Sequence, residues 1–101
     1  MSTRNLAKIL EKELGPMSFG GFLRAARTMK NLTQIEMAKI LHISRGGICD
    51  IEKGRQFVSI EFAAKLAKKF ALSEALAIEC VIRDSFRRAG LKLEVSIKKI
   101  A

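Results

Sequence analysis

The chain has 101 residues, of which 19 are Lys or Arg and 10 are Asp or Glu, and 49% of its residues are hydrophobic. This length supports one domain with a single core, and the hydrophobic content excludes a disordered chain. The formal net charge of +9 predicts an anionic partner, whereas no apolar run is long enough to make a membrane a partner.

An amphipathic helix is the first predicted element, as an extension in residues 1–17. Apolar residues recur at helical spacing from Leu6 to Leu14, and Gly15 and Pro16 are typical of a helix end. The charges in this stretch are unlike the apolar block of a secretory signal, so we expect a cytoplasmic protein.

Residues 18–72 form the predicted central domain, a succession of short helices. Ser18 is placed to cap a helix from Phe19 to Met29, whose apolar residues, Met29 included, are expected to face the core. The double glycine after Phe19 is expected to weaken the first turn of this helix.

The next helix opens with a capping box, because Thr33 can accept a hydrogen bond from the amide of Glu36 and the Glu36 side chain can return one. After a tight turn at His42, which tolerates a left-handed backbone better than branched residues do, Ser44 is placed to cap another short helix. Two short helices joined by a tight turn, with the small Ala38 at their close approach, are typical of a helix-turn-helix.

Two more helices and a strand are predicted towards the C-terminus. Ser59 opens one helix and Ser73 caps the other. From Leu91 to Ile97 apolar and polar residues alternate, which predicts a β-strand. We assign residues 73–101 to dimerisation or partner binding, with the strand pairing across a dimer or with a partner, or else packing on its own domain.

The stretch from Leu23 to Phe70 resembles the Cro/C1-type (XRE) helix-turn-helix family. The matching residues are Arg27, Leu32, Thr33, Gln34, Ala38, Leu41, Ile43, Ser44, Ile48, Ile51, Glu52, Gly54 and Ser59. The resemblance implies an all-α, lambda-repressor-like helical bundle, here with an N-terminal helix and a short C-terminal β-strand added. It also implies a sequence-specific transcriptional regulator, and not an enzyme, that inserts its second motif helix into the major groove of double-stranded DNA.

By the same resemblance, Arg27 and Glu52 are expected to form a buried or half-buried ion pair that ties the first helix of the domain to the recognition helix. Removing one member would leave the other charge without its partner, at a cost of roughly 3–5 kcal/mol if the pair is buried. Gln34 matches a residue that contacts a phosphate in the phage repressors of this family, and the helix N-terminus that Thr33 caps also favours an anion.

The exposed face of the recognition helix supplies the other candidate DNA contacts, because Ile48 and Ile51 must face the core. The full predicted DNA-binding set is Thr33, Gln34, Ser44, Arg45, Gly46, Gly47, Asp50, Lys53 and Arg55. Arg45 is the candidate reader of guanine through the O6 and N7 atoms, with a plain phosphate contact as the alternative.

The glycines and the aspartate on this face need separate explanations. Gly46 and Gly47 each cost the helix roughly 1 kcal/mol relative to alanine, but they let the backbone approach the DNA and move specificity towards DNA shape. Asp50 either accepts a hydrogen bond from the N4 amino group of cytosine or pairs with Lys53 one turn away.

A single short reading helix contacts few base pairs, so we expect a homodimer that represses from a palindromic operator. The alternative is an antitoxin that neutralises a protein toxin and regulates its own operon, as small proteins resembling this family often do. No catalytic motif occurs in the sequence, and its two cysteines and one histidine lack metal-site spacing. We therefore expect no enzyme activity, no cofactor and no metal.

Overall fold

The computed structural model describes residues 17–100, which contain five α-helices. Their bounds are α2 Phe19–Met29, α3 Gln34–Leu41, α4 Arg45–Glu52, α5 Ile60–Lys69 and α6 Glu74–Arg88. This part of the chain is therefore all-α, as the sequence predicted. The helix predicted in residues 1–17 lies outside the described residues, apart from Met17.

A side-chain hydroxyl sets the start of each described helix. In each case the hydroxyl oxygen accepts a hydrogen bond from the backbone amide three residues further on. The five N-caps are Ser18, Thr33, Ser44, Ser59 and Ser73, and all five confirm the prediction. Each cap contributes typically about 1 kcal/mol, so the helix boundaries are fixed locally by short sequence signals.

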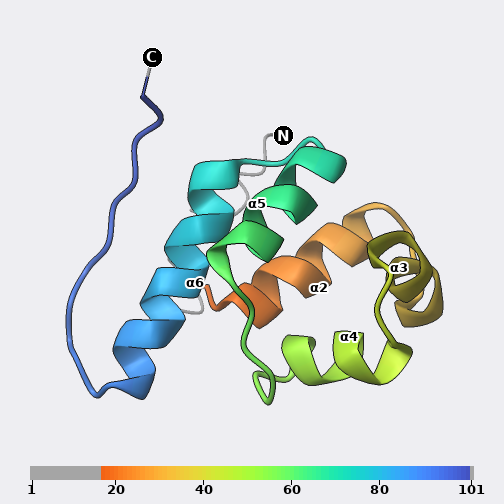
Figure 1. The fold of residues 1–101 in the computed structure, drawn as a ribbon, viewed down its shortest axis with the longest axis horizontal. Helices are drawn as coiled ribbons and strands as arrows, with labels where there is room; N and C mark the ends of the chain where they lie inside the picture. The colour runs from red at the N-terminus through yellow and green to blue at the C-terminus, as the bar shows by residue number, and fades with distance from the viewer. Residues whose placement is uncertain (1–16, 101) are drawn as a thin grey trace.

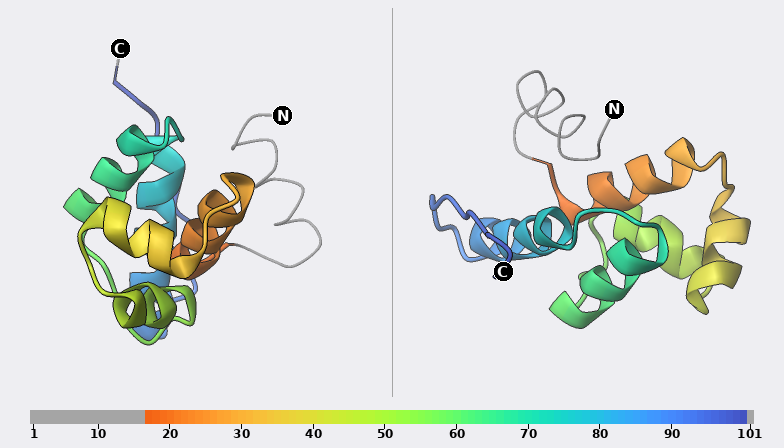
Figure 2. Two further views of the ribbon diagram at one scale, coloured as in Figure 1. Left: turned by 90° about the vertical axis from the view of Figure 1, so that its right-hand side faces the viewer. Right: turned by 90° about the horizontal axis from the view of Figure 1, so that it is seen from above.

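Helix α2 is the centre of the bundle, because it contacts both α4 and α6, while α3 packs against α4 and α5 against α6 (Figure 1). The most completely buried side chains come from all of these helices. They are Phe22, Leu23, Met37, Ile48, Leu66, Leu76 and Cys80. Figure 2 shows α3 and α4 at one end of the molecule and α6 with the C-terminal segment at the other.

Two expectations about the edges of this core are wrong. Met29 is 45% exposed, because it lies in the last turn of α2, beyond the reach of the packed helices. The strand predicted from Leu91 to Ile97 is absent from the described structure, where residues 91–100 follow α6 as an extended segment without strand pairing (Figure 1).

The C-terminal segment turns back along α6 after Gly90, which has a left-handed φ of 71°. Its backbone is held to α6 where the amide of Leu91 donates a 2.8 Å hydrogen bond to the Phe86 carbonyl and where the amide of Ile97 donates a 3.0 Å hydrogen bond to the Glu79 carboxylate. Apolar and polar residues do alternate in this segment, but a strand also needs a neighbouring strand to pair with. Residues 17–100 provide helices as the only regular elements around this segment.

Candidate nucleic-acid interface

The turn between α3 and α4 has the geometry that a helix-turn-helix requires. His42 follows α3 in the left-handed conformation, with φ 57° and ψ 40°, and the Ile43 amide donates a 3.0 Å hydrogen bond to the Ala38 carbonyl. Ser44 then caps α4, its hydroxyl accepting a 2.9 Å hydrogen bond from the amide of Gly47. The chain thus reverses over a few residues, with His42 carrying the positive φ.

An ion pair between Arg27 and Glu52 connects α2 to the last residue of α4. The Arg27 Nε lies 2.7 Å from one carboxylate oxygen of Glu52 and the Nη2 lies 3.1 Å from the other. The Nη1 donates to the carbonyl of Leu32 at 3.0 Å. The side chains of Arg27 and Glu52 are only 14% and 5% exposed, so the pair is largely buried. Its hydrogen bond raises the pKa of Arg27 and keeps the guanidinium charged.

The side chain of Gln34, at the start of α3, also reaches this ion pair. Its Nε2 donates a 3.3 Å hydrogen bond to the Glu52 carboxylate. Next to it, the predicted capping box is present: the Thr33 hydroxyl accepts from the Glu36 amide at 3.1 Å, and the Thr33 amide donates to the Glu36 carboxylate at 2.9 Å. The hydrogen bond from the Thr33 backbone amide to the Glu36 carboxylate, with a smaller contribution from the Thr33 side chain, lowers the pKa of Glu36.

Gly20 sets the distance between α2 and α4. A Cβ atom at this position would lie 2.5 Å from the carbonyl oxygen of Ile51 and 2.7 Å from that of Glu52. Backbone atoms cannot move aside cheaply, so only glycine permits this approach. The glycine therefore positions the end of α4, which is a different role from the weakened first turn that the sequence suggested.

Helix α4 turns two opposite faces to its surroundings. Ile48 and Ile51 are 0% and 3% exposed, while Arg45 and Gly46 at its N-terminal end are exposed. A Cβ on Gly46 would meet open space up to the Ser44 hydroxyl at 3.9 Å, whereas one on Gly47 would be only 3.2 Å from that capping hydroxyl. The exposed N-terminal end of α4 thus combines a guanidinium with bare backbone.

Asp50 pairs with Arg55, and not with Lys53, the intramolecular partner that the sequence suggested as one of two alternatives. The Arg55 Nε and Nη2 lie 3.1 Å and 3.0 Å from the same carboxylate oxygen of Asp50. Helix spacing could not predict this pair, because Arg55 follows Gly54, whose φ of 76° turns the chain back over the last turn of α4. Lys53 itself is exposed at the C-cap.

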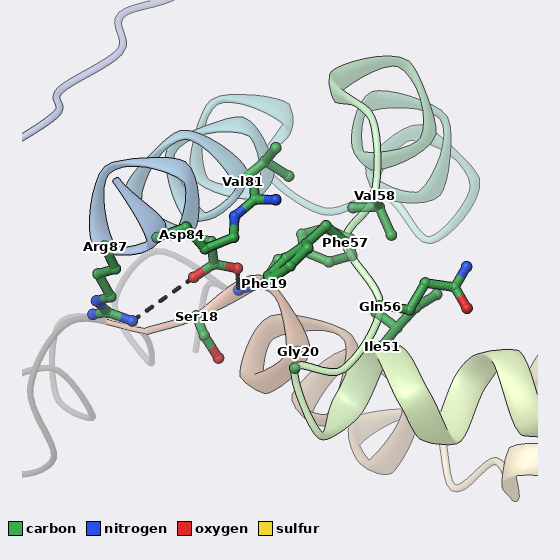
Figure 3. Close-up of a pocket in the computed structure, with 12 residues that line it drawn as sticks. Ser18, Phe19, Gly20, Ile51, Gln56, Phe57, Val58, Val81, Asp84 and Arg87 are labelled. Carbon is green, nitrogen blue, oxygen red and sulfur yellow. Dashed lines mark hydrogen bonds and ion pairs between the residues drawn. The ribbon is translucent and has the colours of Figure 1, made fainter. Parts of the chain in front are cut away.

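Behind α4, an open pocket of about 190 Å³ is lined by the loop after Gly54, the start of α2 and the end of α6 (Figure 3). Its polar groups make structural contacts: the Asp84 carboxylate accepts from the Phe19 amide at 3.0 Å and lies 3.7 Å from the Arg87 guanidinium. The Arg88 guanidinium stacks 3.5 Å from the centre of the Phe57 ring. These contacts connect the loop that leaves the recognition helix to α6.

The predicted residues lie at the N-cap and start of α3, in the turn, along α4 and in the loop after it. The structure adds partners that the sequence did not indicate. These additions are the Gln34 bond to Glu52, the Asp50 pair with Arg55, and the tight approach at Gly20. Each joins residues through tertiary folding or a left-handed turn, for which periodicity gives no signal.

Within residues 17–100, no three potential metal-ligating side chains come together. The side chain of Cys49 is half-buried and that of Cys80 is buried. None of the helices in this part of the chain combines the length and the apolar composition needed to cross a membrane.

Comparison with known proteins agrees with this geometry. Residues 23–76 match the family described as Helix-turn-helix (HTH_3). An uncharacterized HTH-type transcriptional regulator of Methanocaldococcus jannaschii is 44% identical over 50 residues, which cover 50% of this chain and 76% of that protein. The crystal structure of the clp gene regulator ClgR from Corynebacterium glutamicum aligns with a TM-score of 0.53 and 30% identity, covering 71% of this chain and 78% of that one.

Proposed function

The chain belongs to the helix-turn-helix family of DNA-binding transcriptional regulators, and we propose that it is a repressor that binds a palindromic operator as a dimer. The observation that carries this proposal is the way α4 is fixed to the core at one face and at its C-terminal end. Its inner face is buried in the core and its last residue is held by the Arg27–Glu52 pair, while its N-terminal end is exposed. A rigid helix presented in this way suits insertion into the major groove.

The predicted set of DNA contacts divides into positioning and reading groups. Thr33 and Gln34 lie at the N-terminus of α3, where backbone amides and the helix dipole favour a phosphate. Ser44, Gly46 and Gly47 bring the backbone of α4 close to the groove. Arg45 reads guanine, because its planar guanidinium can donate to O6 and N7 together.

The exposed cations at the far end of α4 complete the surface. Lys53 and Arg55 neutralise phosphates and add to the salt dependence of binding. The Arg27–Glu52 pair stays structural in this proposal, because its groups are already hydrogen-bonded to each other inside the protein.

A dimer is proposed because one reading helix covers too few base pairs for useful specificity. Residues 73–101 are its proposed contact region. Leu91, Leu93 and Ile100 are 49%, 57% and 92% exposed there, so the segment offers apolar surface to a second copy. The relatives found are named as regulators, so we propose a regulator and not the antitoxin alternative.

The test is to select duplexes from a random-sequence pool with the full-length protein, and to compare binding to a selected and a scrambled duplex by fluorescence anisotropy over a salt series. We expect the selected duplex to bind more tightly. Arg45→Ala should lose about 1–3 kcal/mol of this discrimination, whereas Lys68→Ala, an exposed cation of α5, should keep it. Equal and steeply salt-dependent binding to both duplexes would reduce the interaction to charge alone and overturn the proposal.

A further inference from the structure

Arg55 is held in place by the backbone before its side chain makes any contact. Its amide donates a 2.8 Å hydrogen bond to the carbonyl of Asp50, and the next amide, that of Gln56, donates to the same carbonyl at 3.2 Å. With Gly54 in the left-handed conformation, this turn fixes where the arginine leaves the main chain. The Asp50 carboxylate therefore affects only the orientation of the guanidinium.

The carboxylate uses a single oxygen for this contact. Oδ1 of Asp50 receives the Arg55 Nε at 3.1 Å and the Nη2 at 3.0 Å. Among the described residues, the two hydrogens of the Arg55 Nη1 have no acceptor, and Nη2 makes one further weak contact, with the Cys49 sulfur at 4.0 Å. One edge of the guanidinium is thus held by the protein while the other is available to a ligand.

A carboxylate on a helix that faces DNA also needs an electrostatic explanation. An unpaired Asp50 would repel the phosphates that the surrounding cations attract, and pairing with Arg55 cancels that charge locally. The side chains of Arg55 and Asp50 are 60% and 44% exposed, so this pair adds little to folding stability. Its effect must be sought in binding.

We propose that Asp50 is a positioning residue and not a base reader: it orients the Arg55 guanidinium so that the free edge binds a DNA phosphate beside the recognition helix. A phosphate is the expected ligand, because the planar guanidinium fork matches its oxygens and because Arg55 lies beyond the C-terminal end of α4, away from the end that meets the bases. Such a contact fixes the register of α4, on which the base contacts depend. This inference rests on the proposed function.

The test compares four full-length proteins: wild type, Asp50→Asn, Arg55→Lys and the double variant. The readout is the ratio of affinities for the selected and the scrambled duplex. Asp50→Asn should raise affinity for the scrambled duplex and lower the ratio by about 2- to 150-fold, the range of coupling between contacting side chains. Arg55→Lys, which keeps the charge but loses the fork, should lower the ratio similarly.

The decisive comparison is the double variant, which should lose no more of the ratio than the more damaging single variant. Glu94→Gln removes the same charge from the exposed C-terminal segment, at the opposite end of the molecule from α4 (Figure 2), and should leave the ratio unchanged. Thermal unfolding of all the proteins controls for folding.

Three results would overturn the inference. An unchanged ratio in Asp50→Asn would make Asp50 a repelling charge only. If Asp50→Asn lowered the affinity ratio equally in the wild-type background and in the Arg55→Lys background, Asp50 would be an independent base reader. Failure of the wild type to discriminate the two duplexes would remove the proposed function and this inference with it, and is seen before any variant is measured.

Discussion

Gly20 and Gly46 are both near the start of a helix, yet their surroundings differ. A Cβ on Gly20 would lie 2.5 Å from the carbonyl oxygen of Ile51, whereas one on Gly46 would have its nearest neighbour at 3.9 Å. We predict that Gly20→Ala lowers the free energy of unfolding by about 1–3 kcal/mol, because α2 and α4 must move apart. Gly46→Ala should raise it by about 1 kcal/mol through helix propensity.

Urea unfolding of the two variants checks these two predictions. Equal changes in the free energy of unfolding would show that α2 and α4 do not approach closely at Gly20. For Gly46 the stability measurement also bears on function. If bare backbone brings α4 close to DNA, the more stable Gly46→Ala protein should bind the selected duplex more weakly than the wild type. Gly46 would then make α4 less stable but allow it closer contact with DNA.

At the scale of elements, the Arg27–Glu52 pair fixes the recognition helix to α2. Because the two side chains are 14% and 5% exposed, Arg27→Met leaves a buried carboxylate without its cation. We predict a loss of about 3–5 kcal/mol in the free energy of unfolding. The matched control is Arg24→Met on the exposed side of the same helix, which should change stability by less than about 0.5 kcal/mol. Similar losses in both variants would contradict a special role for the pair.

The capping box of α3 makes part of the stability depend on pH. Hydrogen bonds lower the pKa of Glu36 in the folded state, so the carboxylate stabilises the fold fully above the ordinary glutamate pKa. That contribution is lost as pH falls from there through the lowered folded pKa. We predict that the difference in unfolding free energy between wild type and Glu36→Gln is constant above about pH 6 and shrinks towards about pH 3. A difference that stays constant over this range would contradict the prediction.

The elements that the sequence predicted well are those with local causes. All five hydroxyl caps, the capping box and the left-handed turn residue His42 are encoded within a few residues of where they act. The prediction of a C-terminal strand was wrong because the alternation of apolar and polar residues is a property of one segment, whereas a strand forms only when a second strand pairs with it. The Asp50–Arg55 pair was missed because a left-handed Gly54 lies between the two residues, and helix spacing ends there.

At the scale of the whole molecule, the predicted DNA contacts and the exposed apolar residues of the C-terminal segment lie in different places. The predicted DNA contacts lie in α3, the turn, α4 and the loop just after it, while the C-terminal segment with its exposed apolar residues lies at the other end of the molecule (Figure 2). A dimer formed through that segment would leave both recognition helices uncovered. This separation is the reason for testing dimerisation independently of DNA.

We predict that Leu93→Lys, or removal of the chain after Gly90, raises the dimer dissociation constant by at least about 100-fold. Leu93 is 57% exposed, and two copies of a leucine that become buried in a symmetric interface contribute about 1.5 kcal/mol each or more. Ile35→Lys is the matched control, because Ile35 is 53% exposed but lies on α3. Sedimentation equilibrium should find a dimer for the wild type and the control and a monomer for the other two at the same concentration. If the truncated chain stays dimeric, the contact surface must lie outside the C-terminal segment, and the two recognition helices would then be spaced by a different part of the bundle.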